Sequence, residues 1–498
     1  MKVMLFVPPG GYLAERWSRG TLMPALGVLY LAAVLEQHGT EVEVVPGHVL
    51  GLSWREIYRK IESDRPDVVG ITTTTENRFL SFRLAKVAKA AHPATFVVLG
   101  GPHCRGTAED TLAHLPEVDG VVSGEGERTM LELVKALEAR GDLRSIAGLT
   151  FRRGEEVVSN PSRQKFVDLN ALPLPARHLV PWEKYHFQLE VPGQGLQPAA
   201  NLMTSRGCPF NCAFCATPGN WGRRVRGRTP AKVVAEIEHL REHYGAQALW
   251  FCDDTFNYHP QRTEAICDLL LERKLDVHWY CEVALPGLTK RLLAKMAEAG
   301  LFYLGFGVES ASERICREVI NKPFALEHAY QVIAWCHEFG VRPNPFFIFG
   351  HPTETWAEAQ ETMRVIEELG DRAEISVALA RIYPGTAWER RARAEGKLPP
   401  DFTWTRQDER VLTLPAIQGQ APVYLSDDLS WAQVCELLLR AASLQKRLSW
   451  PRRIWRVLSS LRSFADLRRY GVMFLIWAKK LWSRAPRASR ADTCVGDS

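Results

Sequence analysis

The stretch SRGCPFNCAFC, residues 205–215, brings three cysteines together on one short loop. Cys208 and Cys212 are separated by three residues, and Cys212 and Cys215 by two. A structural zinc site normally closes with four ligands from two Cys-x-x-Cys-like pairs, and this chain has a single such arc. A disulfide would leave one thiol over in a reducing compartment. Three thiolates at this spacing are instead typical of a 4Fe–4S cluster whose fourth iron stays open.

The neighbours of the cysteines suit such a loop. Gly207 and Pro209 are expected to shape a tight turn. Such a turn is needed because one short loop has to bring its three cysteines to three irons of the same cluster. Phe214, next to Cys215, is predicted to form an aromatic wall near the open iron. A substrate or cofactor that chelates this iron would therefore lie against Phe214.

The composition fits a large folded protein with reduced thiols. A length of 498 residues suggests about three domains, and 46% hydrophobic with 24% charged residues is ordinary for a globular chain. The 11 cysteines lack the dense spacing of a disulfide scaffold, and the net charge of +5 is modest. Only a short apolar run precedes Pro8 and Pro9, which argues against a signal peptide. We expect a cytoplasmic protein.

Residues 1–150 alternate strand-like runs with helical periodicity, which predicts a doubly wound parallel sheet with ligands bound beyond the carboxyl ends of its strands. No G-x-G-x-x-G follows the first strand, which argues against a nicotinamide dinucleotide site. Tight turns are the alternative role for the glycines. The candidate ligand contacts at the predicted strand ends are Thr72, Gly100, Gly101, His103, Gly124 and Glu125.

This region resembles the cobalamin-binding domain that precedes many radical S-adenosylmethionine (SAM) enzymes. The matching stretches are LGVLYLAAVLEQHGTEVEVV, DVVGITTTT, VVLGGPH and DGVVSGEGE. The resemblance implies that the candidate contacts at the strand ends bind cobalamin; for His103, capping a turn is the alternative. The loop PPGGYLAERWSRGTLMPALG lacks the cobalt-binding histidine of other cobalamin proteins, which implies that no protein histidine lies beneath the metal.

A connector over residues 151–194, read as a hairpin and an extended Pro-rich segment, leads to a second alternating region at 195–420. Strands and helices that follow a cysteine loop predict a partial (β/α) TIM-type barrel, with its chemistry at the carboxyl ends of the strands. The whole chain is thus expected to be α/β, with a Rossmann-like domain, a barrel and a helical C-terminal region. The cysteines expected to be buried packing residues are Cys252, Cys267, Cys281, Cys316 and Cys336.

Residues 195–410 resemble the radical SAM fold, and the whole chain is similar to class B radical SAM methyltransferases. The motifs that carry the resemblance are GCPFNCAFC, DDTF, GFGVES, FFIFGHPTET and YPGT. The resemblance implies that SAM chelates the open iron, with Glu309 and Ser310 near its ribose. Asp253 and Asp254 would lie near its amino group or the substrate. For these four residues, capping of strand ends and surface exposure are the alternatives.

One strand departs from the family pattern. The arginine commonly found shortly after it is missing, and Val283, Ala284 and Leu285 stand there instead. One contact to SAM or substrate that the family would provide is therefore in doubt.

The resemblance implies a cobalamin-dependent radical SAM methyltransferase. A 5′-deoxyadenosyl radical would take hydrogen from an unactivated carbon, and methylcobalamin would then supply a methyl group. A radical cyclase or rearrangement catalyst is the alternative, followed by a non-catalytic cobalamin-binding protein. A methylthiotransferase would need further cluster cysteines in residues 1–150, where only Cys104 is present. The expected partners are a small molecule, such as a lipid or a natural-product precursor, and an electron donor such as flavodoxin or ferredoxin.

The C-terminal region, residues 421–498, is expected to be helical. Residues 421–450 are predicted to form a helix that covers the mouth of the barrel. After Pro451, arginines and lysines interleave with tryptophan and phenylalanine, a pattern that suits the inner face of a membrane. The run VMFLIWA is too short to span a bilayer. Nucleic acid is not expected as a partner, and a solvated helix packed on the barrel is the other alternative.

Overall fold

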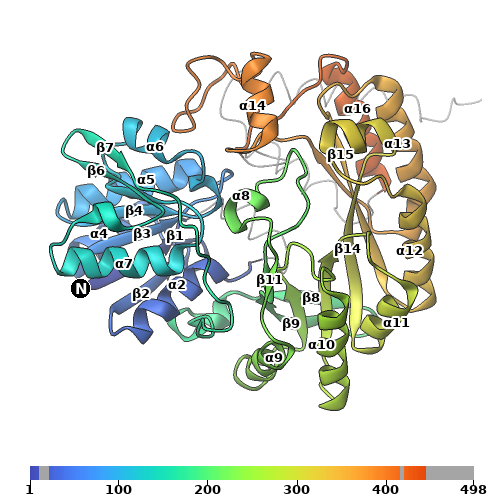
Figure 1. Ribbon diagram of the computed structural model, residues 1–498, viewed down its shortest axis with the longest axis horizontal. Coiled ribbons are helices and arrows are strands. Elements are labelled where there is room, and N and C mark those ends of the chain that lie inside the picture. The colour runs from blue at the N-terminus through green and yellow to red at the C-terminus, as the bar shows by residue number, and fades with distance from the viewer. Residues whose placement is uncertain (10–21, 415–419, 445–498) are drawn as a thin grey trace, which may run out of the picture.

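The computed structural model describes residues 1–9, 22–414 and 420–444, which form two seven-stranded sheets (Figure 1). The first sheet has the strand order β2-β1-β3-β4-β5-β6-β7, and the second has the order β16-β15-β14-β13-β12-β9-β8. Residues 10–21, which hold most of the loop that lacks a cobalt-binding histidine, fall outside the described residues, as does the basic segment after Pro451.

The first sheet has five parallel strands with helices on both faces. In β1, Val3 and Leu5 face one hydrophobic cluster while Met4 and Phe6 face the other, as expected of a strand buried on both sides. The parallel strands are β1 (Lys2–Val7), β2 (Glu41–Pro46), β3 (Val68–Thr72), β4 (Phe96–Gly100) and β5 (Gly120–Val122). The helices are α2 (Leu26–Gln37), α3 (Gly47–Leu50), α4 (Trp54–Asp64), α5 (Arg78–Ala91), α6 (Ala108–His114) and α7 (Gly126–Glu138). The Rossmann-like fold is confirmed.

Two hairpins at the ends of the connector belong to the sheets, and sequence analysis predicted only the first of them. Strands β6 (Leu149–Arg153) and β7 (Glu156–Ser159) extend the first sheet, because β6 pairs antiparallel with β5. This covers the edge that the short strand β5 would otherwise expose. Strand β8 (Gln188–Val191) pairs antiparallel with β9 (Gly195–Leu202) at one end of the second sheet.

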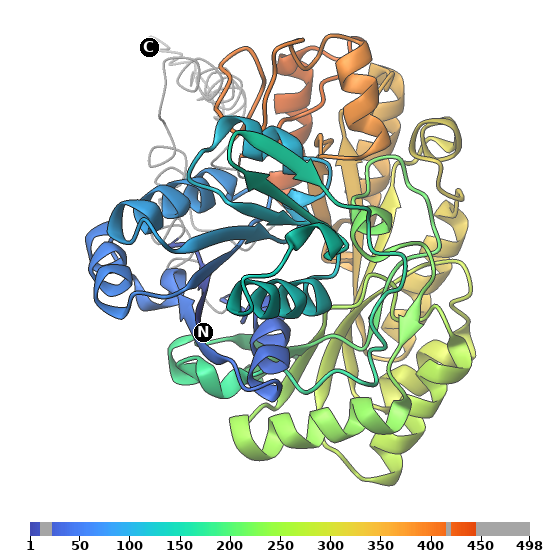
Figure 2. The same ribbon diagram turned by 60° about the vertical axis from the view of Figure 1, so that its left-hand side comes forward.

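The second sheet is a half-open barrel with its helices on the outside (Figures 1 and 2). Its other parallel strands are β12 (Ala248–Phe251), β13 (His278–Val283), β14 (Leu301–Glu309), β15 (Arg342–Phe349) and β16 (Ser376–Leu379). Its covering helices are α9 (Pro230–Tyr244), α10 (Pro260–Glu272), α11 (Lys290–Glu298), α12 (Leu326–Glu338) and α13 (Trp356–Leu369). This arrangement confirms the partial (β/α) barrel.

Shorter elements connect the larger ones. The cysteine loop carries β10 (Ser205–Arg206), α8 (Thr217–Trp221) and β11 (Arg226–Gly227), and a π-helix, η5 (Ile315–Ile320), follows β14. The 3-10 turns are η1 (Pro102–Cys104), η2 (Leu143–Ser145), η3 (Arg177–Leu179), η4 (Trp182–Lys184) and η6 (Gly370–Arg372). In the described residues the last helices are α14 (Ala387–Ala394) and α16 (Trp431–Leu444).

Helix α16 does not cover the barrel mouth, and this part of the sequence prediction is wrong. Val434 and Leu437 join the hydrophobic cluster on the outside of the barrel, and Arg440 forms a 2.8 Å ion pair with Glu367 of α13. The apolar face of α16 packs against α13, and this contact explains why α16 lies on the outside of the barrel. Among residues 1–9, 22–414 and 420–444, no helix is both long and apolar enough to cross a membrane.

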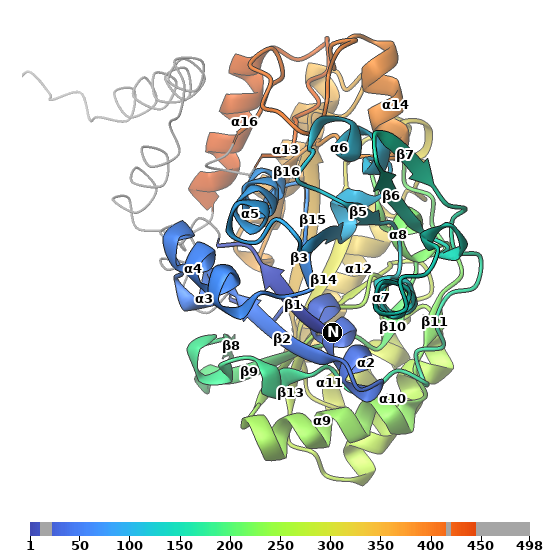
Figure 3. The ribbon, with the colours of Figure 1, turned by 90° about the vertical axis from the view of Figure 1, so that its left-hand side faces the viewer.

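The two domains meet at the carboxyl edges of their sheets; Figure 3 looks onto the first domain, with the second behind it. After β3, Glu76 accepts a 2.8 Å hydrogen bond from the Tyr383 hydroxyl, which follows β16. Arg78, also after β3, donates to the carbonyl oxygens of Trp404 and Gln420 at 3.0 and 2.8 Å. Because ligands of parallel sheets bind at this edge, the arrangement brings the two predicted ligand sites to one seam.

Candidate active site

The cysteine loop stands on a short two-stranded stem. Ser205 pairs with Gly227 and Arg206 with Arg226, so residues 207–225 form a loop closed by β10 and β11. Gly207 has a φ of +100°, and a Cβ there would lie 2.6 Å from the Arg224 carbonyl oxygen. Only glycine fits this bend, which starts the cysteine loop.

The far side of the loop is fastened to the π-helix η5. The Ala213 amide donates to the Ile320 carbonyl at 2.7 Å, and the Asn321 side-chain amide donates to the Asn211 carbonyl at 3.2 Å. A π-turn of this kind is frequent at functional sites. Here its end holds the backbone around Cys212 in place.

The structure brings the three cysteines of the loop to the wall of one cavity of about 440 Å³. The cavity lies at the carboxyl ends of β12 to β16, where the barrel prediction placed the chemistry. Most of its wall is apolar. Its polar and cysteine lining consists of Cys208, Cys212, Cys215, Thr217, Asp254, Thr255, Glu282, Glu309, Lys322 and Ser376.

The thiols fit an iron–sulfur cluster. All three are unpaired and partly buried, and burial raises the pKa of Cys212 to about 12 and raises that of Cys215. Iron binding would deprotonate them. Within the described part of the chain, no three His, Cys, Asp or Glu side chains converge on a point as one metal ion requires. Cluster thiolates each bind a different iron, so they need no such convergence.

Three carboxyl groups face the cavity from three successive strand ends. Asp254 follows β12 and accepts a 3.0 Å hydrogen bond from the Thr217 hydroxyl, while burial raises its pKa to about 6. Glu282, in β13, accepts a 3.0 Å hydrogen bond from the Tyr280 hydroxyl. Burial raises the pKa of Glu282, and the Asp254 carboxyl adds to the rise. The third carboxyl is Glu309, at the end of β14.

Lys322 is the one cation among the residues that line the cavity, and sequence analysis missed it. Its ammonium lies 2.6 Å from the Glu309 carboxylate and 2.9 Å from the Gly307 carbonyl oxygen. Glu309 has a φ of 69°, a strained value for a side-chain-bearing residue, and the strand pairing is irregular at this point. The bend turns the carboxylate towards Lys322. A lysine soon after the GFGVES strand end was the available signal.

Asp253 and Ser310 do not line the cavity. The Asp253 carboxylate accepts hydrogen bonds from the Thr204 amide at 2.7 Å and from the Thr204 and Ser205 hydroxyls at 2.6 and 2.5 Å. The Ser310 hydroxyl lies 3.2 Å from that of Thr362 and accepts from the Ser312 amide. Both side chains form hydrogen bonds that cap strand ends. Capping of strand ends is the alternative role that sequence analysis gave for them. Phe214 and Asp254, in contrast, do line the cavity.

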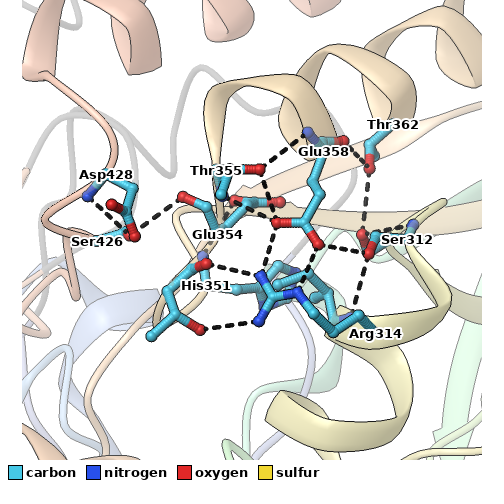
Figure 4. Close-up of polar contacts among 12 residues, drawn as sticks. Ser312, Arg314, His351, Glu354, Thr355, Glu358, Thr362, Ser426 and Asp428 are labelled. Atoms are coloured by element: carbon cyan, nitrogen blue, oxygen red, sulfur yellow. Dashed lines mark hydrogen bonds and ion pairs between the residues drawn. The ribbon is translucent and has the colours of Figure 1, made fainter.

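The GHPTE turn after β15 is held by two carboxyl groups, one buried on Glu354 and one partly buried on Glu358 (Figure 4). Glu354 accepts from the amides of Gly350 and His351 at 2.6 and 3.2 Å, and burial raises its pKa to about 8. Glu358 forms a two-pronged pair with Arg314, at 2.7 and 2.9 Å. These contacts tie the segment after β14 to α13 and so fix the cavity wall.

At the edge of the first sheet, the predicted cobalamin contacts come together after β3, β4 and β5. Gly101 has a φ of +107°, and a Cβ there would lie 2.7 Å from the Thr73 carbonyl oxygen, so this turn requires glycine. Thr72 ends β3, Gly100 ends β4 and Gly124 follows β5. Their common placement suits a ligand that lies across these strand ends.

His103 is buried at this edge, beside Trp404 and Phe82. Its Nδ1 lies 3.1 Å from the Thr75 hydroxyl, and its buried Nε2 has no hydrogen-bond partner among the described residues. Burial lowers the pKa of His103 to about 3, so the ring is neutral. An unpartnered buried nitrogen fits a bound group here.

Glu125 is held by protein groups from outside the first sheet. One carboxylate oxygen lies 3.2 Å from Arg206 and 2.8 Å from Arg226, and the other accepts from the Val167 amide at 2.9 Å. Both oxygens are thus engaged by protein groups. The predicted cobalamin contact of Glu125 stays a prediction.

Comparisons with known families agree with both halves of this arrangement. The model of the radical SAM superfamily matches residues 202–366, and that of the B12 binding domain matches residues 17–134. The chain is 35% identical over 392 residues to an uncharacterised methyltransferase of Pyrococcus horikoshii, covering 78% of this chain and 83% of the relative.

Other relatives are more distant. An anaerobic magnesium-protoporphyrin IX monomethyl ester cyclase of Rubrivivax gelatinosus is 29% identical, over 73% of this chain and 65% of the cyclase. A cytidylyl-2-hydroxyethylphosphonate methyltransferase of Streptomyces wedmorensis is 28% identical, over 74% of this chain and 77% of the relative.

Two solved structures share the fold. The radical SAM methyltransferase TsrM from Kitasatospora setae, solved with cobalamin and a [4Fe-4S] cluster, has a TM-score of 0.69 at 17% identity and covers 96% of this chain and 99% of its own. The cobalamin-dependent radical enzyme OxsB, solved with aqua-cobalamin, has a TM-score of 0.70 at 17% identity. The match covers 95% of this chain and 72% of OxsB. In both cases the likeness concerns the fold alone.

Proposed function

The chain belongs to the radical SAM superfamily and carries a B12-binding domain ahead of its radical SAM domain, and from this we propose that it methylates an unactivated carbon of a small molecule. It is a cobalamin-dependent radical SAM enzyme whose cofactors are a 4Fe–4S cluster, SAM and cobalamin. The observation that carries the methylation proposal is the 35% identity to a relative named as a methyltransferase, over 83% of that relative.

Bound together, these cofactors supply a carbon-centred radical and a methyl group for transfer. The chain contributes binding, orientation and the exclusion of water. Cys208, Cys212 and Cys215 would hold three irons of the cluster, on a loop fixed at both sides. The open iron would then face the cavity, where SAM has to lie.

The polar groups of the cavity suit the ends of SAM. The Lys322 ammonium offers a positive charge for the carboxylate of SAM, and the carboxyl groups of Asp254 and Glu282 offer acceptors for its amino group. Apolar side chains such as Phe214 and Phe306 form much of the remaining wall. They would keep water from a reactive radical.

We further propose that the substrate is a lipid or a natural-product precursor and that a protein such as flavodoxin or ferredoxin supplies electrons. The experiment uses the purified protein under anoxic conditions, with its cluster and cobalamin, SAM deuterated in its methyl group and a chemical reductant. Extracts of cells with and without the gene provide candidate substrates. Methylation predicts a product that gains one labelled methyl group, and a product with an unchanged carbon count would reject it.

A radical cyclase is the second candidate, and the 29% identity to the magnesium-protoporphyrin monomethyl ester cyclase supports it. The same assay separates the two functions. A cyclase would consume SAM and form a ring without any deuterium in the product. Failure to cleave SAM to 5′-deoxyadenosine at all would favour a non-catalytic cobalamin-binding protein.

A further inference from the structure

Four charged side chains, three buried and one partly buried, join the stem of the cysteine loop to the first domain. Arg206 is 2% exposed and lies 2.6 Å from Glu127 and 3.2 Å from Glu125. Arg226, which pairs with Arg206 across the stem, lies 2.8 Å from Glu125. We call Arg206, Arg226, Glu125 and Glu127 the Arg206 clamp.

Aromatic rings enclose the central cation of the Arg206 clamp. The guanidinium carbon of Arg206 lies 4.7 Å from the ring centroid of Trp221 and 5.4 Å from that of Tyr30. Trp221 ends helix α8 of the cysteine loop, whereas Tyr30 belongs to α2 of the first domain. The guanidinium is therefore held by groups of both domains and has little freedom to turn.

The sequence positions of these residues connect the two cofactor sites. Arg206 immediately precedes Gly207 and Cys208, where the cysteine loop begins. Glu125 follows Gly124 at the end of β5, and Glu127 lies in the first turn of α7. The Arg206 clamp thus joins the loop that would hold the cluster to the sheet edge that would hold cobalamin.

Stability alone does not account for such a clamp. Removing charges from water is costly, and a well-packed apolar group of the same volume often gives equal or greater stability. What a forked guanidinium with two carboxylates adds is a defined geometry, because each hydrogen bond has a preferred length and direction. A defined geometry between two cofactor sites is useful where the cofactors act on one substrate.

We propose that the Arg206 clamp sets the spacing between the cysteine loop and the cobalamin-binding edge, and hence between the cluster and cobalt. Arg206 is then a positioning residue. The proposal rests on the two cofactors being bound together. It does not depend on whether the reaction is methylation or cyclisation, so the two proposals can fail separately.

The test measures the coupling between unpaired electrons on the cluster and on cobalt. The holoenzyme is prepared anoxically with cob(II)alamin and a singly reduced cluster, and the dipolar coupling is recorded by electron paramagnetic resonance. The wild type should show one narrow distance distribution. Arg206→Gln and Glu127→Gln should shift or broaden it, and Arg206→Lys should restore it in part.

Arg163→Gln is the matched control. Arg163 forms a 2.5 Å ion pair with Glu132 of the same helix α7, but it comes from the connector and does not touch the cysteine loop. Its loss should leave the distance distribution unchanged.

An unchanged distribution in both Arg206→Gln and Glu127→Gln would overturn the proposal, as would an equal change in the control. If Arg206→Gln does not fold, Glu127→Gln decides, because it keeps the shape of the side chain and removes one charge. Loss of cobalamin from either variant, with an unaltered cluster spectrum, would also overturn it. The clamp would then support the cobalamin site alone.

Discussion

The Lys322 ammonium lies 2.6 Å from the Glu309 carboxylate, on the wall of the cavity that the three cysteines share. The side chains are 8% exposed for Glu309 and 22% for Lys322, so water screens this pair only in part. The pair places one positive charge among the three carboxyl groups of the cavity.

Replacing Lys322 by methionine should weaken SAM binding. The change removes the cation offered to the SAM carboxylate and leaves Glu309 without its partner. The expected loss is about 10- to 100-fold in affinity, the equivalent of about 1.5–3 kcal/mol for a hydrogen bond to a charged group. Anoxic calorimetric titration of the cluster-loaded protein with SAM measures it. The control Lys290→Met removes an exposed ion pair with Glu338, and an equal loss there would contradict the role of Lys322.

Alanine at Cys208, Cys212 and Cys215 should abolish the cluster, because the thiolates are the ligands that the loop provides. The triple variant should lack bound iron and sulfide and the brown colour of the reconstituted protein. Cys435→Ala, in α16 and outside the cysteine loop, should keep the bound iron, the sulfide and the brown colour. Normal iron content in the triple variant would refute the assignment of the cluster site.

Gly101→Ala should distort the edge predicted to bind cobalamin. At a φ of +107°, the new Cβ would meet the Thr73 carbonyl oxygen, so the turn has to move at a cost of about 1–3 kcal/mol. Cobalamin retention after gel filtration should fall. Gly141→Ala, elsewhere in the first domain and not a predicted cobalamin contact, is the control, because the nearest atom to its Cβ would be the Ala136 carbonyl oxygen at 3.6 Å, an ordinary contact. Equal retention in the two variants would place cobalamin elsewhere.

Glu354→Gln should reduce the pH dependence of stability. Burial raises the pKa of Glu354 from 4.5 to about 8. Between these values the unfolded chain releases a proton that the folded chain keeps, so the free energy of unfolding falls as pH rises. The decline is at most about 1.4 kcal/mol per pH unit.

Urea unfolding at several values between pH 5 and 8 measures this slope. The Gln variant should show a flatter decline than the wild type. Glu361→Gln, exposed and in helix α13 that follows the turn of Glu354, is the control that should keep the wild-type slope. A wild-type slope in Glu354→Gln would show that another group titrates.

Local patterns were enough to predict the two sheets and the cysteine loop. Runs such as KVMLFV identify buried parallel strands, and the spacing of Cys208, Cys212 and Cys215 identifies a cluster loop. The orientation of residues at strand ends could not be predicted in the same way. Asp253 and Asp254 are adjacent, yet the first accepts hydrogen bonds from Thr204 and the second faces the cavity. Both follow the end of β12, where no strand or helix period fixes the direction of a side chain.

Contacts between distant parts of the chain explain the other differences. Glu125 follows a glycine-rich strand end and looks like a ligand contact, but Arg206, 81 residues later, occupies it. Lys322 lies in the segment after a π-helix, which gives no periodic signal. Such roles depend on which elements become neighbours in the fold.

The hydrogen bonds of Arg78 have a consequence for the order in which the protein is made. This buried arginine of the first domain donates to carbonyl groups 326 and 342 residues further along the chain. On the ribosome, the first domain therefore emerges long before the backbone that satisfies it has been translated. A nascent or prematurely terminated chain would leave this cation without those two acceptors. The first domain can therefore complete its buried hydrogen bonds only after residues 404 and 420 have been synthesised.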